Sequence, residues 1–201
     1  QRYTAGQCNF VAIPVFPSRC FRHSFIAVNR RAGINGPKDL EGRRIGVPLY
    51  TMTAAVYIRG MLQDEFGVDL SRCTWVEGAI NTSGAHGAPT VLPLLKPVDI
   101  EKGPSNKSLD NLIQEGHVDA TLGTSVPESH RTNPDIGRLF PDFVVRERDY
   151  YARTGVYPIM HLIAIKKSVY ERYPFVATSL YNAFERSKQI ALERMFNLRA
   201  F

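Results

Sequence analysis

The sequence predicts an α/β fold, and two alternations of strand and helix carry that prediction. Residues 43–48 and 73–77 are short β-rich runs, and residues 51–66 between them have the length and apolar spacing of a helix. A strand, a helix and a second strand in succession form a βαβ unit, so the sheet is expected to be at least partly parallel. A second helix followed by a strand at residues 118–122 repeats the alternation.

The helix at residues 51–66 carries recognisable signals at both ends. Thr51 or Thr53 can supply the N-cap hydroxyl, and Gly67 stands where a left-handed glycine commonly ends a helix. The next helix is expected to run from a cap at Ser105 or Ser108 to a stop at Gly116.

The rest of the chain is assigned from composition and periodicity. No stable period is found in residues 79–104, and a polar stretch follows Gly123 up to about residue 149. Both segments are expected to be irregular. A long amphipathic helix is expected from Pro174 to about Met195. Further β-rich runs lie at residues 10–16, 25–29 and 159–165, the last of which is expected to be a buried strand.

Composition excludes several classes of protein. The chain has 201 residues, 44% hydrophobic and 22% charged, so it can bury a core. Its apolar runs are too short to span a membrane, and three cysteines without paired spacing argue against a disulfide scaffold or a zinc cluster. The net charge of +6 comes from dispersed residues, without a motif typical of nucleic-acid binding. These features favour a small anionic ligand over nucleic acid or a membrane.

The first candidate site is the basic segment 19–24, which lies between two expected strands. Arg19 and Arg22 can each bind a carboxylate through a fork of N–H groups, and His23 is the type of side chain that exchanges protons near neutral pH. Ser24 adds a hydroxyl. The alternative interpretation is a solvated polar turn without a ligand.

The second candidate site is the start of the helix at residues 51–66. A helix that follows a parallel strand presents free N–H groups and a partial positive charge, which together favour an anion. Tyr50, Thr51 and Thr53 add hydroxyl groups at that point. The alternative is ordinary capping, for which a threonine suffices.

The third candidate site surrounds the entry to the strand expected at residues 159–165. Arg153, Tyr157 and His161 bring a cation, a phenol and an imidazole to this point, although a strand histidine can also be a hydrogen-bonded core residue. The loop 123–127, with small polar residues, is a weaker fourth candidate. No metal site is predicted, and motifs of zinc proteases, serine hydrolases and phosphate-binding loops are absent.

Several segments resemble a known protein family. Residues 37–48 and 112–120 are similar to the second lobe of type II periplasmic-binding-protein folds. More specifically, residues 10–24, 51–57, 138–142 and 150–161 resemble the 4,5-dihydroxyphthalate decarboxylase family.

This resemblance implies a two-lobed fold with mixed, largely parallel sheets. Residues 1–30 and 158–201 would form part of a discontinuous, incomplete first lobe, and residues 31–157 would form the second. Family members carry further sequence at both ends, so the chain is expected to be an internal fragment. The ligand is expected in a cleft, where the helix start at Thr51 would face the turn that carries Arg19 and His23.

The resemblance also implies an activity, the conversion of 4,5-dihydroxyphthalate to protocatechuate and carbon dioxide in the cytoplasm. His23 and His161 would be the general acid and base, in either order, and the arginines would hold the carboxylates. No cofactor is expected, although the catechol could chelate a divalent metal. The histidines could instead only hydrogen-bond the substrate.

Two other functions stay open at this point. The first is a substrate-binding protein of an ABC transporter for an anionic small molecule, which would be periplasmic. The second is another aromatic-acid enzyme on the same scaffold, since one fold supports many functions. The sequence does not determine the oligomeric state.

Overall fold

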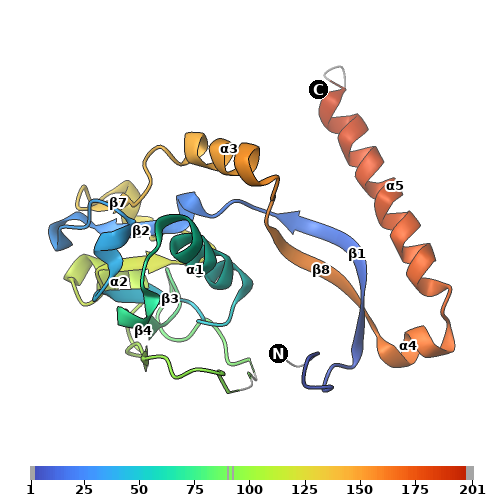
Figure 1. The fold of residues 1–201 in the computed structure, drawn as a ribbon, viewed down its shortest axis with the longest axis horizontal. Coiled ribbons are helices and arrows are strands. Elements are labelled where there is room, and N and C mark those ends of the chain that lie inside the picture. The colour runs from blue at the N-terminus through green and yellow to red at the C-terminus, as the bar shows by residue number, and fades with distance from the viewer. Residues whose placement is uncertain (1–2, 90, 92, 198–201) are drawn as a thin grey trace. The chain divides into compact units, whose positions relative to one another are not determined.

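The structure is a computed structural model that describes residues 3–89, 91 and 93–197 (Figure 1). These residues form two compact units. One combines the residues up to Cys20 with those from Ile159 onward, and the other is Phe21–Pro158. The predicted boundary near residue 30 therefore lies at residue 20 in the structure. The reason is that residues 26–29 pair within the sheet of the second unit.

The second unit is built on a six-stranded mixed sheet with the order β5-β4-β3-β6-β2-β7. Strands β5, β4, β3 and β6 are parallel to one another, whereas β2 is antiparallel to both β6 and β7. The prediction of an α/β fold with a mixed, largely parallel sheet is confirmed. The strands are β2 (Ile26–Asn29), β3 (Arg44–Val47), β4 (Thr74–Glu77), β5 (Ile100–Lys102), β6 (Ala120–Leu122) and β7 (Ile136–Arg138).

Helix α1 (Thr53–Phe66) follows β3 and confirms the predicted βαβ unit. Gly67 ends it in the left-handed conformation with φ +62°, as predicted. The predicted threonine cap is wrong. The N-cap residue is Met52, which makes no side-chain capping bond, and Thr53 is already helical. The free N–H groups at this end are therefore not capped by a hydroxyl.

Helix α2 (Leu109–Glu115) begins and ends where the sequence indicates. Ser108 accepts the backbone N–H of Asn111 at 3.1 Å, and Asn111 Oδ1 accepts the backbone N–H of Ser108 at 3.0 Å. This reciprocal capping box satisfies two N–H groups that a helix start leaves open. Gly116 closes the helix with φ +77°.

The core lies on both faces of the six-stranded sheet. Alternate residues of a strand point to opposite faces, so Trp75 packs with the α1 side chains Ile58 and Leu62, while Val76 packs with Leu109 and other side chains of α2. All of these side chains are less than 5% exposed. Each fully buried aliphatic side chain stabilises the fold by about 1.5–3 kcal/mol relative to an exposed one.

Part of the stretch expected to be irregular is regular. Helix α3 (Phe143–Thr154) begins within the last part of the predicted polar loop, and β5 and β7 are also regular. Helix α3 has no fully buried residue, so it lacks the strong apolar stripe from which a helix is recognised. Short 3-10 turns complete the unit at His23–Phe25, Arg30–Ala32, Pro37–Leu40, Leu70–Arg72 and Glu128–Arg131.

The first unit is a two-stranded antiparallel ribbon followed by two helices (Figure 1). Strand β1 (Phe10–Arg19) pairs with β8 (Ile159–Lys166), and α4 (Lys167–Arg172) and α5 (Val176–Phe196) follow. A small core joins Ile13 and Ile165 to Leu180 and Phe184 of α5. Strand β8 was expected to be buried, but half of its side chains are exposed because it has a single partner strand. Among the described helices, none has both the length and the hydropathy needed to cross a membrane.

Candidate functional site

The sheet topology brings several loops of the second unit to one edge. Strands β3 and β6 are parallel, so their carboxyl ends point the same way. Because β2 is antiparallel to β6, with Ile26 opposite Leu122, the residues that precede β2 lie beside the carboxyl end of β6. Ligands of open α/β sheets bind at this edge. The segment that carries His23 is therefore positioned at the expected ligand edge.

Gly123 shows how closely the loops at this edge approach one another. A Cβ atom at Gly123 would lie 2.9 Å from two ring carbons of Pro48 and 3.0 Å from Cδ1 of Ile80. The loops after β3, β4 and β6 therefore meet at a residue without a side chain. The predicted role of loop 123–127 in ligand contact stays a prediction, but the glycine has a packing role.

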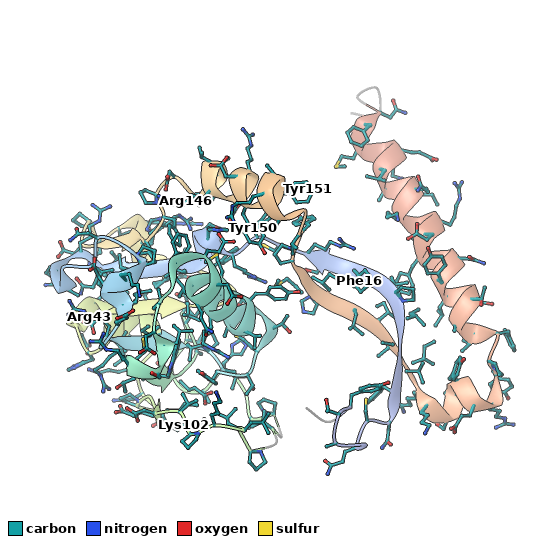
Figure 2. The ribbon with its side chains drawn as sticks, viewed as in Figure 1. Phe16, Arg43, Lys102, Arg146, Tyr150 and Tyr151 are labelled. Carbon is teal, nitrogen blue, oxygen red and sulfur yellow. The ribbon has the colours of Figure 1, made fainter. Side chains whose placement is uncertain are left out.

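A pocket of about 310 Å³ lies next to this edge, between the segment before β2, one face of α1 and the end of α3. The residues that α1 contributes to the pocket are three or four positions apart, so they lie on one face of the helix. Tyr150 and its neighbour Tyr151 both project from α3 (Figure 2). The pocket is lined by Phe21, Arg22, His23, Val56, Tyr57, Gly60, Met61, Asp64, Glu65, Tyr150 and Pro158.

His23 is the most buried titratable side chain in the pocket wall, with 2% of its surface exposed. Its ring contacts those of Phe140 and Tyr150 edge to face, with centroid separations of 5.6 and 5.7 Å. Its buried Nδ1 has no hydrogen-bond partner among the described residues. Burial lowers the pKa of His23 below 6.5, and Arg146 and Arg153 lower it further against the opposing effect of Glu65. The imidazole is therefore mainly neutral at pH 7, as a general base requires.

Arg22 precedes His23 and is also buried, with 8% of its surface exposed. Its guanidinium lies over the ring of Phe25 at 4.8 Å. The sequence prediction placed Arg22 and His23 in one site, and the structure brings both to the same pocket. A cation and a neutral imidazole side by side suit an anionic ligand that carries an exchangeable proton.

Ser24 is held by its backbone rather than placed in the pocket wall. Its N–H donates to Oε1 of Glu147 at 3.4 Å, and its carbonyl accepts a hydrogen bond from the guanidinium of Arg138. Burial raises the pKa of Glu147, and the backbone N–H groups of Ser24 and His23 partly offset this effect. Helix α3 therefore fixes the turn that carries His23.

Arg153 and Tyr157 belong to the rim of the same pocket through their partners. Arg153 forms an ion pair at 2.9 Å with Glu65, which lines the pocket. The ring of Tyr157 stacks on that of Phe21 at 4.8 Å, and Phe21 lines the pocket. Neither residue is itself in the wall, and their expected roles toward a ligand stay predictions.

Tyr50, Thr51 and Thr53 do not line the pocket of His23. Tyr50 and Thr51 line a different hollow of about 490 Å³ together with Glu77 and Lys102. The carboxylate of Glu77 accepts the backbone N–H of Tyr50 at 2.7 Å and pairs with Lys102. A protein carboxylate thus holds the backbone just before the helix start at which the sequence predicted an anion. Thr53 is exposed and lines neither hollow.

Arg19 and His161 lie in the first unit. Strand β1 extends through Arg19, so this residue is not in a turn, and its guanidinium lies 5.2 Å from the ring centroid of Phe16. His161 is exposed on β8, opposite Ser18, so it is not a core residue. Their expected roles toward a ligand stay predictions.

Several pocket residues were not singled out from the sequence. Tyr57, Met61 and Asp64 follow a helical spacing of four and three, so the periodicity of α1 could have indicated their common face. Glu147, which supports the turn from outside the pocket wall, could not be found in this way, because no periodic pattern predicts the helix that carries it. In the part of the chain that the structure describes, no group of three His, Cys, Asp or Glu side chains is arranged to hold a metal ion.

Comparison with known proteins identifies relatives of the whole chain. No family model matches it. A 4,5-dihydroxyphthalate decarboxylase of Comamonas testosteroni is 37% identical over 197 residues, which cover 98% of this chain and 59% of that protein. The chain is homologous to 4,5-dihydroxyphthalate decarboxylase. A protein of the same name from Pseudomonas putida is 36% identical over 148 residues, or 73% of this chain and 57% of that protein. The predicted resemblance is confirmed.

The homology to 4,5-dihydroxyphthalate decarboxylase is accompanied by a likeness in fold to a binding protein. The periplasmic aliphatic sulphonate binding protein SsuA of Escherichia coli matches 98% of this chain and 54% of its own, with a TM-score of 0.51 and 12% identity. At this identity the likeness shows the fold alone. The chain spans less than two thirds of the length of each of these relatives.

Proposed function

We propose that the protein is a decarboxylase that converts 4,5-dihydroxyphthalate to protocatechuate and carbon dioxide. The observation that carries the proposal is the buried imidazole of His23 beside Arg22, in the wall of a pocket, in a chain homologous to such decarboxylases. The low pKa of His23 and its unpartnered Nδ1 support a role in proton transfer. As an enzyme of aromatic catabolism, it is proposed to act in the cytoplasm.

The chemistry needs a base at a hydroxyl and an acid at a ring carbon. Each hydroxyl of the substrate is para to a carboxylated carbon, so removal of its proton pushes electron density onto that carbon. Protonation there gives a non-aromatic dienone. The carbon–carboxylate bond then breaks, its electron pair returns to the ring, and carbon dioxide leaves. The base finally returns its proton to the phenolate, so the reaction consumes one proton overall.

The state of His23 suits the first of these roles. A neutral imidazole in the free protein can accept the hydroxyl proton, and the negative charge of the ligand stabilises the imidazolium that forms. The proposal therefore makes His23 the base. Of the two histidines predicted as acid and base in either order, His161 would then supply the proton for the ring carbon, and this role stays a prediction.

Two other parts of the pocket suit the substrate. Arg22 provides a guanidinium for one carboxylate, and Phe21, Tyr57 and Tyr150 provide aromatic surface for the ring. Glu65 would repel a dianion, and its ion pair with the exposed Arg153 offsets only part of this charge.

A substrate-binding protein of an ABC transporter is the second candidate, favoured by the likeness in fold to SsuA. The two functions differ in turnover. We expect the protein to release carbon dioxide and protocatechuate from 4,5-dihydroxyphthalate. Phthalate, which lacks hydroxyl groups, should bind and remain intact. Tight binding of an anion by calorimetry, with 4,5-dihydroxyphthalate recovered unchanged, would favour transport and contradict the decarboxylase proposal.

A further inference from the structure

Arg59 lies in the middle of α1 and turns away from the solvent. Its guanidinium carbon stands 3.6 Å from the ring centroid of Tyr50 and 5.6 Å from that of Trp75. One N–H group donates to the carbonyl of Tyr50 at 2.5 Å. These contacts orient the guanidinium, and among the described residues its other N–H groups have no hydrogen-bond acceptor.

Among the described residues, no carboxylate forms an ion pair with Arg59. Arg44, Arg72 and Arg153 each form an ion pair at 2.6–2.9 Å, whereas Arg59 forms none with any described residue. Burial lowers the pKa of Arg59, so the environment disfavours its charged form. An arginine nonetheless keeps its proton in proteins. A half-buried cation without a counter-ion is therefore present on α1.

A pocket of about 440 Å³ adjoins this cation. Lys96 contributes a second positive charge to its wall and Gln63 contributes an amide. Asp99 is the acidic residue of the wall, and its Oδ2 accepts the hydroxyl of Thr74 at 2.9 Å. The described side chains that line this pocket thus carry two positive charges and one negative charge.

Trp75 supplies a second donor without an acceptor in the same region. Its side chain is fully buried, its ring lies 5.2 Å from that of Tyr50, and its Nε1 has no hydrogen-bond partner among the residues described. A buried N–H without a partner destabilises the folded state. The guanidinium of Arg59 and the unpartnered N–H of Trp75 therefore both belong to side chains that contact the ring of Tyr50.

We propose that the pocket at Arg59 is a binding site for a small oxyanion, either a carboxylate or a phosphate. The fork of guanidinium N–H groups matches two oxygens of such a group, and Lys96 adds attraction. The site shares only Val56 and Gly60 with the pocket of His23, and it lies on a neighbouring face of α1. It does not depend on the decarboxylase proposal.

Trp75 makes the test direct, because it is the one tryptophan of the 201-residue chain. The chain is titrated at constant ionic strength with sodium phosphate, sodium acetate or sodium chloride, and its fluorescence and melting temperature are followed. Phosphate or acetate should change the emission with saturation and raise the melting temperature, and chloride should do neither. The anion that binds more tightly, phosphate or acetate, identifies the class of ligand.

Two variants locate the site. Arg59→Gln keeps a donor for the Tyr50 carbonyl but removes the charge and the fork, so the anion should bind at least about tenfold more weakly. Arg31→Gln removes a cation that pairs with Asp135 on the surface, and the response should be unchanged. Circular dichroism checks that both variants are folded.

The proposal is overturned by any of three results. These are no saturable response to phosphate or acetate, an equal response to chloride, and an undiminished response in folded Arg59→Gln. If that variant does not fold, Arg59→Lys serves instead, since it keeps the positive charge and loses the fork. If the response to phosphate or acetate is undiminished both in Arg59→Lys and in Lys96→Gln, the proposal is then overturned.

Discussion

The backbone N–H of Ser24 donates to the carboxylate of Glu147 at 3.4 Å, although the two residues are 123 positions apart in the chain. This bond joins α3 to the turn that carries His23. The position of the His23 imidazole in the pocket therefore depends on α3, whose Glu147 holds the turn without lining the pocket.

Removing this carboxylate should loosen the turn. Glu147→Ala leaves the N–H of Ser24 without its acceptor, so we expect the free energy of unfolding to fall by about 1–3 kcal/mol. Glu147→Gln keeps an acceptor oxygen and should lose less. Urea unfolding monitored by circular dichroism measures both. Equal losses in the two variants would contradict the role of this hydrogen bond.

Replacing His23 should abolish most of the proposed decarboxylation. We expect His23→Gln to lower kcat by more than about tenfold, or about 1.4 kcal/mol, because glutamine cannot accept and return a proton. His161→Gln tests the second predicted histidine in the same assay of carbon dioxide release. His86→Gln, at an exposed loop position, should have wild-type kcat. A kcat within about tenfold of wild type for His23→Gln would exclude His23 as the base.

His23 should also make stability depend on pH. Its folded pKa lies below 6.5, so the unfolded chain binds the proton more tightly than the folded chain. The stabilisation is complete above pH 6.5 and is lost as the pH falls through the folded pKa. Urea unfolding at a series of pH values should therefore show a shallower decline in acid for His23→Gln than for wild type. Parallel curves would mean that the buried imidazole titrates normally.

Glu65 should weaken the binding of an anionic substrate. Its side chain lines the pocket, and its partner in the ion pair, Arg153, is exposed to solvent. Glu65→Gln should therefore lower KM for 4,5-dihydroxyphthalate by about two- to tenfold. It should also lower the pKa of His23, because Glu65 raises that pKa. Glu171→Gln, on α4 in the first unit, is the control. An increased KM in Glu65→Gln would contradict this and indicate that Glu65 accepts a hydrogen bond from a hydroxyl group of the substrate.

Two glycines should respond in opposite ways to alanine. A Cβ at Gly123 meets the rigid ring of Pro48 at 2.9 Å, so Gly123→Ala should destabilise the protein by about 1–3 kcal/mol. A Cβ at Gly60 meets nothing within 4 Å, so Gly60→Ala in the middle of α1 should stabilise it by about 0.5–1 kcal/mol. Thermal unfolding measures both. A neutral Gly123→Ala would show that the loops at this edge of the sheet can move apart.

The sequence by itself determined the features that depend on neighbours along the chain. Ser108 with Asn111, and the glycines at positions 67 and 116, set helix ends through hydrogen bonds and backbone angles within a few residues. The alternation of strands and helices then determined the α/β class. The pairing of Arg22 with His23 in one site was predictable for the same reason, since they are adjacent.

Only the tertiary structure decided how distant segments meet. The pairing of β2 with β6 and β7 moved residues 21–30 into the second unit, and packing turned a charged stretch into α3. Glu77 bonds to the backbone of Tyr50 and Glu65 pairs with Arg153, so two residues predicted to bind a ligand have protein partners. Such contacts depend on packing and burial, which join residues far apart in sequence and leave no periodic signal in either segment. The neutral state of His23 has the same origin, because its pKa is set by the side chains that exclude water from it.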